Sequence, residues 1–199
     1  MAAMFFLPFM LLNFFSGIIG GIWLAVLGNW TVVLAGLALT FGGLFIVSLL
    51  LMPSVLLMVP LAGYEQISKS KFAMINFTIL SLTYTYCVMS IWAIGIFWYF
   101  AHNSTTDAAI PTILWSYSTA TAVWSYMAQK EGQAGNRYTV FSAFFYQISC
   151  IALMIYTYTN FRSPNPYDMF FWFAVPMGIS LIVQIALVAF APKAYWDRP

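Results

Sequence analysis

Charged side chains are scarce in this sequence. Its 199 residues include seven Lys or Arg and five Asp or Glu, or 6% charged residues, whereas about 25% of an ordinary soluble domain is charged. All twelve lie between long apolar runs, as expected when a charge at the centre of a bilayer costs roughly 2.5–3.5 kcal/mol. We therefore exclude a soluble fold and predict an all-α, polytopic membrane helical bundle that forms a single transmembrane domain over residues 1–199.

Residues that carry catalytic or metal chemistry are almost absent as well. One histidine, His102, cannot supply a bis-histidine haem or a His-rich metal site. No predicted span contains an acidic residue for a proton relay or a Lys for a Schiff base. Cys87 and Cys150 both lie in apolar runs, where a cysteine usually behaves as a small hydrophobe. We predict that the protein is not an enzyme, and that it has no cofactor and no metal site.

The apolar runs predict six transmembrane helices, because about 20 residues cross a hydrocarbon core of ~30 Å. Their approximate ranges are 4–27, 31–61, 72–101, 109–128, 138–160 and 169–191. The second run is longer than one crossing needs. Pro53 and Pro60 make a break in it plausible, since proline removes a backbone donor and clashes with the preceding turn. Residues 53–61 are then either transmembrane or interfacial.

The basic residues predict the orientation of the bundle. With a cytoplasmic N-terminus, the inner segments 62–71, 129–137 and 192–199 contain six of the seven Lys and Arg, and the outer loops contain only Arg162. By the positive-inside rule both termini are cytoplasmic. Without the fourth helix, the least apolar of the six, Lys130 and Arg137 would move outside, so the charges support this span. We expect a multi-pass protein of a plasma or inner membrane rather than of an organelle, with no nucleic-acid partner at a net charge of +2.

Tryptophans predict a belt at the outer interface. Its members are Trp23, Trp30, Trp98, Trp115 and Trp172.

Small residues predict close packing of the first two helices. One face of the first helix carries Asn13, Ser16, Gly17, Gly20 and Gly21, and the second helix carries Gly36, Thr40 and Gly43. The short Gly28-Asn29-Trp30 connection makes these helices an antiparallel hairpin. The glycines are interpreted either as sites of tight packing or as a functional hinge.

Hydroxyl and amide side chains form polar stripes on the next three helices. The stripes are Asn76, Thr83, Cys87 and Ser90, then Ser118, Thr121, Ala122, Ser125 and Gln129, and then Thr139, Ser142, Tyr146 and Ser149. One interpretation is hydrogen bonding between helices, and the other is a narrow polar path through the bundle.

Four amides lie within the predicted spans: Asn13, Asn76, Gln147 and Gln184. A buried amide without a hydrogen bond costs several kcal/mol in hydrocarbon. We predict that at least two of Asn13, Gln147 and Gln184 meet at one level; the alternative is that each bonds separately to a Ser, Thr or backbone carbonyl. The candidate polar layer or pore lining is Asn13, Thr83, Ser90, Ser118, Thr121, Ser125, Gln147 and Gln184.

These observations leave three functions open. The first is a non-catalytic structural or accessory subunit, which associates in the lipid bilayer with other membrane subunits or with copies of itself. The second is a channel or facilitator for an uncharged or weakly hydrated solute, with the candidate residues as its lining. The third is a binder of a lipid or quinone-like apolar ligand. It is motivated by the tryptophan belt and by tyrosines within the spans, namely Tyr84, Tyr86, Tyr146, Tyr156 and Tyr158.

Overall fold

The protein is a bundle of α-helices. The computed structural model describes residues 2–68, 71–133 and 137–190, and these contain six α-helices, one short 3₁₀ helix and no strand. The α-helices are α1 (Ala2–Val26), α2 (Trp30–Ser68), α3 (Lys71–His102), α4 (Ala109–Gln133), α5 (Arg137–Thr159) and α6 (Pro166–Ala189), and the 3₁₀ helix η1 (Thr106–Ala108) precedes α4. The predicted all-α class and the six helices are confirmed.

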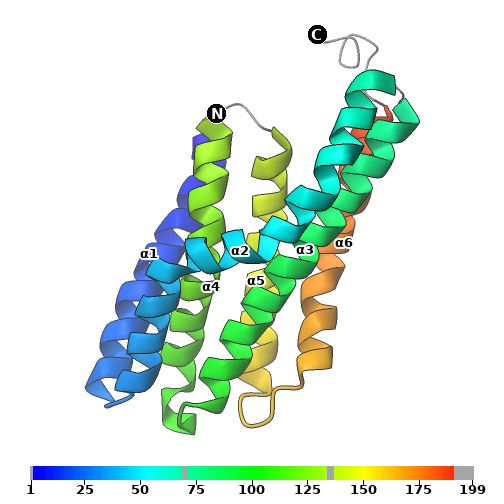
Figure 1. Cartoon of the computed structure of the whole chain (residues 1–199). Helices are drawn as coiled ribbons and strands as arrows, with labels where there is room; N and C mark the ends of the chain where they lie inside the picture. The colour runs from blue at the N-terminus through cyan, green and yellow to red at the C-terminus, as the bar shows by residue number, and fades with distance from the viewer. Residues whose placement is uncertain (1, 69–70, 134–136, 191–199) are drawn as a thin grey trace.

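The helices run alternately up and down. Figure 1 shows the start of α1 and the ends of α2, α4 and α6 towards one end of the bundle, and the connections 27–29, 103–105 and 160–165 at the other. The start of α1 and the end of α6 therefore lie on the same side, as an even number of crossings requires. The six basic residues that predict this side, Lys69, Lys71, Lys130, Arg137, Lys193 and Arg198, have side chains that lie outside the described part of the chain.

The first connection is a tight reversal that Gly28 makes possible. Gly28 has a φ of +79°, in the left-handed region that favours glycine. Its backbone N–H donates to the carbonyl of Ala25, and that of Asn29 donates to the carbonyl of Leu24. These two bonds satisfy carbonyls at the end of α1, as in a glycine-terminated helix. The chain then enters α2 at Trp30, as the sequence predicts.

α2 is longer than predicted and is not broken. Residues 53–61 remain helical, and both Pro53 and Pro60 lie inside Trp30–Ser68. Figure 1 shows that α2 is bent instead: its first part runs beside α1, its middle crosses the bundle, and its last part runs beside α3. The helix contains the Gly42–Gly43 pair as well as the two prolines, which are the features at which helices bend.

α4 is the central helix of the bundle. It packs against α1, α2, α3 and α5, and α6 completes the bundle against α3 and α5. Five helices, α1, α2, α3, α5 and α6, are long and apolar enough to cross a membrane, and α4 is not among them. This agrees with the prediction that the fourth helix is the least apolar. A helix that contacts protein on most of its sides does not need an apolar surface, because its polar groups bond to its neighbours.

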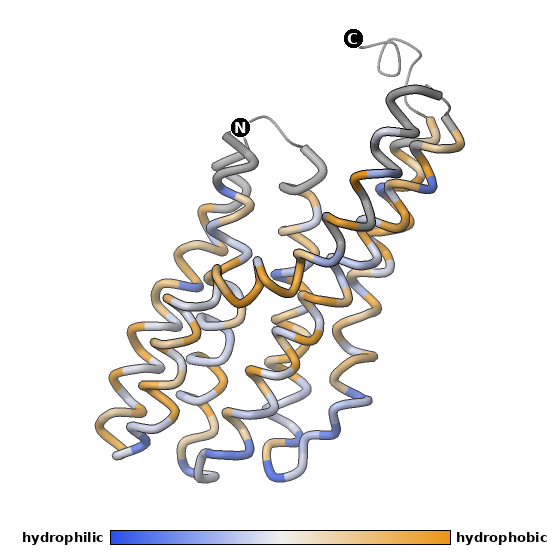
Figure 2. The backbone as a smooth tube through the Cα atoms, viewed as in Figure 1, coloured by the Kyte–Doolittle hydropathy of each residue, from blue (hydrophilic) through white to orange (hydrophobic). Residues whose placement is uncertain are grey.

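The outward faces of the bundle are apolar over large areas. On α1, for example, Phe14 is 59% exposed and Ile22 is 63% exposed, and on α6 Ile182 is 69% exposed. Figure 2 shows hydrophobic residues along all the helices and hydrophilic residues gathered at the lower connections. An apolar surface of this extent faces lipid in a stable protein. The fold is that of a multi-pass integral membrane protein.

Candidate functional site

The contact between α1 and α4 is built on the amide of Asn13. Its Nδ2 atom donates to the Thr121 hydroxyl over 2.5 Å, and its Oδ1 atom accepts from the Ser118 hydroxyl over 3.1 Å. Thr121 in turn donates to the carbonyl of Tyr117 over 2.7 Å. Three of the candidate polar residues therefore meet here, where they join two helices.

Small residues bring the same two helices close together. A Cβ atom added at Gly20 would lie 2.8 Å from both the Pro111 carbonyl oxygen and the Trp115 backbone nitrogen. At Gly17 an added Cβ would lie 2.5 Å from the Ser118 hydroxyl oxygen. Ser16, on the same face of α1, is buried. The small face of α1 thus packs on α4, and the prediction that it packs on the second helix has the wrong partner.

The glycines of α2 likewise pack against α4 and α3 rather than against α1. A side chain at Gly36 would overlap the indole of Trp115, and a Cβ at Gly43 would lie 2.6 Å from Val123 of α4 and 2.9 Å from Trp92 of α3. Thr40, the third residue of this set, is half-buried. Both small-residue faces therefore converge on the central part of the bundle.

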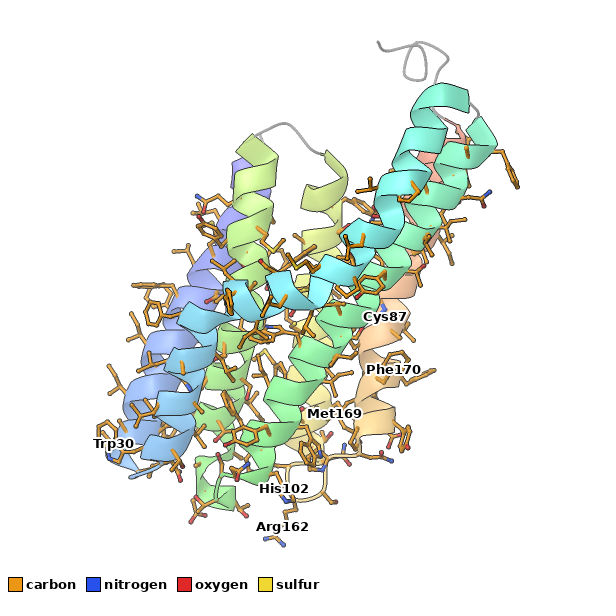
Figure 3. The ribbon with its side chains drawn as sticks, viewed as in Figure 1. Trp30, Cys87, His102, Arg162, Met169 and Phe170 are labelled. Atoms are coloured by element: carbon orange, nitrogen blue, oxygen red, sulfur yellow. The ribbon has the colours of Figure 1, made fainter. Side chains whose placement is uncertain are left out.

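Trp115 fills the notch between α1 and α2. Its indole lies against Gly21 and Gly36, and its Nε1 atom donates to the carbonyl of Val32 over 3.0 Å. The side chain is only 7% exposed. The prediction that Trp115 belongs to the outer belt is wrong, because two glycines leave a space of indole size inside the bundle. Trp30, which Figure 3 labels at the lower end, is exposed as predicted.

Gln147 joins α5 to the same stripe of α4 that Asn13 contacts. Its Oε1 atom accepts from the Tyr117 hydroxyl over 2.7 Å, and its Nε2 atom donates to the Ser125 hydroxyl over 2.8 Å. The hydroxyl of the preceding residue, Tyr146, donates to the carbonyl of Ala120 over 2.8 Å. Gln147 and Tyr146 are fully buried, so these bonds form in the interior of the bundle.

Gln184 lies at the centre of a third cluster, which joins α3, α5 and α6. Its Nε2 atom is 2.6 Å from the Tyr86 hydroxyl oxygen and 2.9 Å from those of Ser142 and Ser180. The Tyr86 hydroxyl is also 2.8 Å from that of Ser180. Gln184 is fully buried, and its Oε1 atom has no partner. One amide and three hydroxyls hold these helices together without any charged group.

The three amides, of which Gln147 and Gln184 are buried and Asn13 is half-buried, do not bond to each other. Asn13 and Gln147 lie at the same level and bond to one stripe of α4, since Thr121 lies between Tyr117 and Ser125, but no hydrogen bond joins the two amides. Gln184 belongs to a separate contact. Asn13 and Gln147 therefore share one level, as predicted, but each of the three amides bonds separately to hydroxyl groups, as the alternative has it. Asn76, the fourth amide, is exposed on α3.

The polar stripe predicted on the third helix does not face the interior. Asn76, Thr83 and Cys87 are exposed, and only Ser90 is buried, where it donates to the carbonyl of Tyr86 over 2.6 Å. Figure 3 labels Cys87 well above His102 on the same helix. Ser90 bonds to its own helix, so its place in the stripe does not require a polar environment.

Other stripe residues are spread over different surroundings. On α4, Ala122 is half-buried and Gln129 is exposed. On α5, Ser149 is buried and donates to the carbonyl of Phe145, whereas the side chain of Thr139 lies outside the described residues. These stripes therefore do not form one continuous lining among the described residues.

Two bonding residues were missed in the sequence, Tyr117 and Ser180, and Tyr86 was named only as a possible ligand contact. Spacing was the available signal. Ser180 lies four residues before Gln184, and Tyr117 lies four before Thr121 on α4. Residues at that spacing share a helix face. Their contribution depends on which helix lies opposite, and spacing within one helix does not give that information.

The lower end of the bundle contains most of the described ionisable side chains. The Tyr156 hydroxyl donates to Asp168 Oδ2 over 3.3 Å and accepts from the Asn165 backbone N–H over 3.2 Å, and these bonds fasten the connection between α5 and α6. His102 stacks on Trp98, with ring centroids 5.3 Å apart. Among the described residues, no group of three His, Cys, Asp or Glu could hold a metal ion.

Comparisons with family models, with curated proteins and with solved structures returned no match to this chain. The arrangement of its own residues is therefore the basis for any functional proposal.

Proposed function

We propose that this chain is a non-catalytic structural or accessory subunit of a membrane assembly, built with other membrane subunits or with copies of itself. The main support is the use of its buried polar groups. Asn13, Gln147 and Gln184 each bond to side chains of neighbouring helices, so the polar chemistry of the interior serves to join helices. Such bonds average about 0.6 kcal/mol each in membrane proteins, which suits a scaffold made of several modest contacts.

The channel alternative has less support. Its proposed lining is divided among separate contacts: Ser118 and Thr121 at α1, Ser125 and Gln147 between α4 and α5, and Gln184 among α3, α5 and α6. Thr83 is exposed on the outer surface of α3. A pore needs lining groups that share one continuous surface. Groups bonded in pairs at different helix contacts do not supply one.

The apolar-ligand alternative also loses part of its motivation. Four of the five tyrosines that suggest it have hydroxyls engaged within the chain. Tyr84 donates to the carbonyl of Leu50, Tyr146 to that of Ala120 and Tyr156 to Asp168, and Tyr86 belongs to the Gln184 cluster. Tyrosines used in this way act as polar joints between elements rather than as free donors to a ligand.

We further propose a plasma or inner membrane, with both termini in the cytoplasm. Six basic residues on the side of the termini against Arg162 alone on the other side support this orientation.

The proposal is tested by two measurements on the same preparation. The chain is extracted from its native membrane into polymer-bounded lipid discs, and the mass of the particles is determined without added detergent. We expect an assembly heavier than one chain; single chains only would overturn the proposal. Vesicles containing the purified chain should pass water, glycerol and urea no faster than empty vesicles. Faster flux that Gln147→Leu abolishes would support the channel instead.

A further inference from the structure

One outward face of α3 differs from the lipid-facing surfaces of α1 and α6. The exposed residues of α1 from Leu7 to Val26 are all apolar, and so are those of α6 from Phe170 to Leu187. The exposed face of α3 instead mixes polar, small and apolar side chains at helical spacing. Its members are Asn76, Leu80, Thr83, Cys87, Ile91, Gly95, Trp98 and His102, and we call them the α3 face.

The α3 face is long and nearly uncharged. From Asn76 to His102 it rises about 39 Å at 1.5 Å per residue, which exceeds a hydrocarbon core of ~30 Å. Its polar groups over this length are an amide, a hydroxyl and a thiol, with the indole of Trp98 and the imidazole of His102 at the end. Lipid tails offer none of these groups a hydrogen bond, whereas another helix does.

Gly95 provides a second, independent sign of an external helix. Added Cβ atoms at Gly17, Gly20, Gly21, Gly36 and Gly43 would all press on neighbouring helices, so those glycines serve packing within the chain. At Gly95, as at Gly42, Gly63 and Gly178, an added Cβ would meet nothing within 4 Å, but of these four glycines only Gly95 is exposed. A glycine inside a helix costs roughly 1 kcal/mol relative to alanine. Within one chain Gly95 has no packing role that offsets this cost, but a close approach from outside would supply one.

We propose that the α3 face binds the α3 face of a second copy of this chain, about a two-fold axis along the membrane normal. Copies of one chain in a bilayer share orientation and depth, so each residue of the face lies level with itself in the partner. An isologous contact requires a self-complementary surface. Carboxamide, hydroxyl and thiol groups meet this requirement, because each both donates and accepts.

The native thiols allow a test without any engineered residue. Cys87 lies on the α3 face and is exposed, whereas Cys150 is buried on α5. Oxidation of native membranes with a membrane-permeant catalyst should produce a disulfide-linked dimer of twice the chain mass. Cys150→Ser should keep this dimer and Cys87→Ser should lose it. A dimer that survives Cys87→Ser would overturn the proposal.

A disulfide needs Cα atoms about 4.4–6.8 Å apart, so a scan along the helix extends the test. In a cysteine-free chain, single cysteines at positions 80, 83, 87 and 91 should cross-link strongly at one or more of these positions. Ile18→Cys, on the apolar face of α1, is the matched control and should not cross-link. Cross-linking at none of the four positions, or no more than at position 18, would contradict the proposal.

A second variant tests the close approach. Gly95→Leu should weaken the cross-link at Cys87 while the fold is kept, since the site is open within the chain. Gly42→Leu, at another open glycine, should leave the cross-link unchanged. Equal cross-linking in both variants would count against a close contact between the α3 faces of two copies.

This inference rests on the assembly proposed above, and its failure can be distinguished from failure of that proposal. Heavy particles without α3 cross-links overturn only the identity of the partner. Single chains in the lipid discs overturn both.

Discussion

Replacing Gly20 by alanine should force α1 away from α4. The added Cβ would lie 2.8 Å from the Pro111 carbonyl oxygen and 2.8 Å from the Trp115 backbone nitrogen, which is 0.6 Å short of an ordinary contact of 3.4 Å. Both neighbours are backbone atoms of α4, so neither can move aside as a flexible side chain would. The helices must separate, and the bonds of Asn13 to Ser118 and Thr121 must lengthen with them.

The expected size follows from two opposing effects. Overpacking typically costs 1–3 kcal/mol, and alanine regains roughly 1 kcal/mol of helix propensity over glycine. We therefore expect Gly20→Ala to lower the free energy of unfolding by about 1 kcal/mol. Gly42→Ala adds a Cβ that meets nothing within 4 Å, so it should raise that free energy by up to about 1 kcal/mol.

The assay is equilibrium unfolding of the purified chain in mixed micelles of increasing SDS content, followed by far-UV circular dichroism and tryptophan fluorescence. The two variants should differ by about 2 kcal/mol, roughly a thirtyfold difference in the unfolding constant. If Gly20→Ala proves as stable as Gly42→Ala, the close contact between α1 and α4 is refuted.

Further substitutions test the other contacts of the bundle. Trp115→Phe removes the bond to the Val32 carbonyl and should cost about 0.5–1.5 kcal/mol in the same assay; no loss would show that the indole is not bonded there. Gln184→Leu should cost about 1 kcal/mol, because interhelical bonds average ~0.6 and reach ~1.7 kcal/mol; an unchanged midpoint would mean that the cluster is dispensable. A small membrane-permeant maleimide should modify Cys87 alone in the folded chain and also Cys150 after unfolding, counted by intact mass; rapid modification of both thiols in the folded chain would contradict the burial of Cys150.

Helix number could be predicted from sequence because lipid imposes a length and a polarity on every crossing. The fourth helix was predicted from the charges that follow it rather than from its apolar content. Its apolar content does not suffice for a span, but Lys130 and Arg137 would change sides without it. The structure places this helix at the centre of the bundle, where protein contacts replace lipid.

Helix partners could not be predicted in the same way. The small face of α1 is visible in the spacing of Gly17, Gly20 and Gly21, but lipid treats every apolar or small face alike. The choice between α2 and α4 depends on the shape of Trp115, which fits against Gly21 and Gly36. That fit is a three-dimensional property, and it also explains why Trp115 is absent from the outer belt.

Polar stripes predicted the buried helix faces poorly, because a hydroxyl can bond within its own helix. Ser90, Ser116, Thr121 and Ser149 each donate to the carbonyl four residues earlier in their own helix. A hydroxyl satisfied in this way can face protein or lipid at little cost. Amides are better indicators because they are too polar to be satisfied so simply. Three of the four, Asn13, Gln147 and Gln184, lie at helix contacts, whereas Asn76 is exposed.

The central claim is that α4 crosses the membrane as the core of the bundle in spite of its polarity. Single cysteines at Asn103, just before η1 and α4, and at Gln129, near the end of α4, test it in sealed vesicles of known orientation with an impermeant thiol reagent. Both native side chains are exposed, so both positions should react. We predict labelling of the two positions from opposite sides. Labelling of both from the same side would contradict a crossing by α4 and the six-helix arrangement with it.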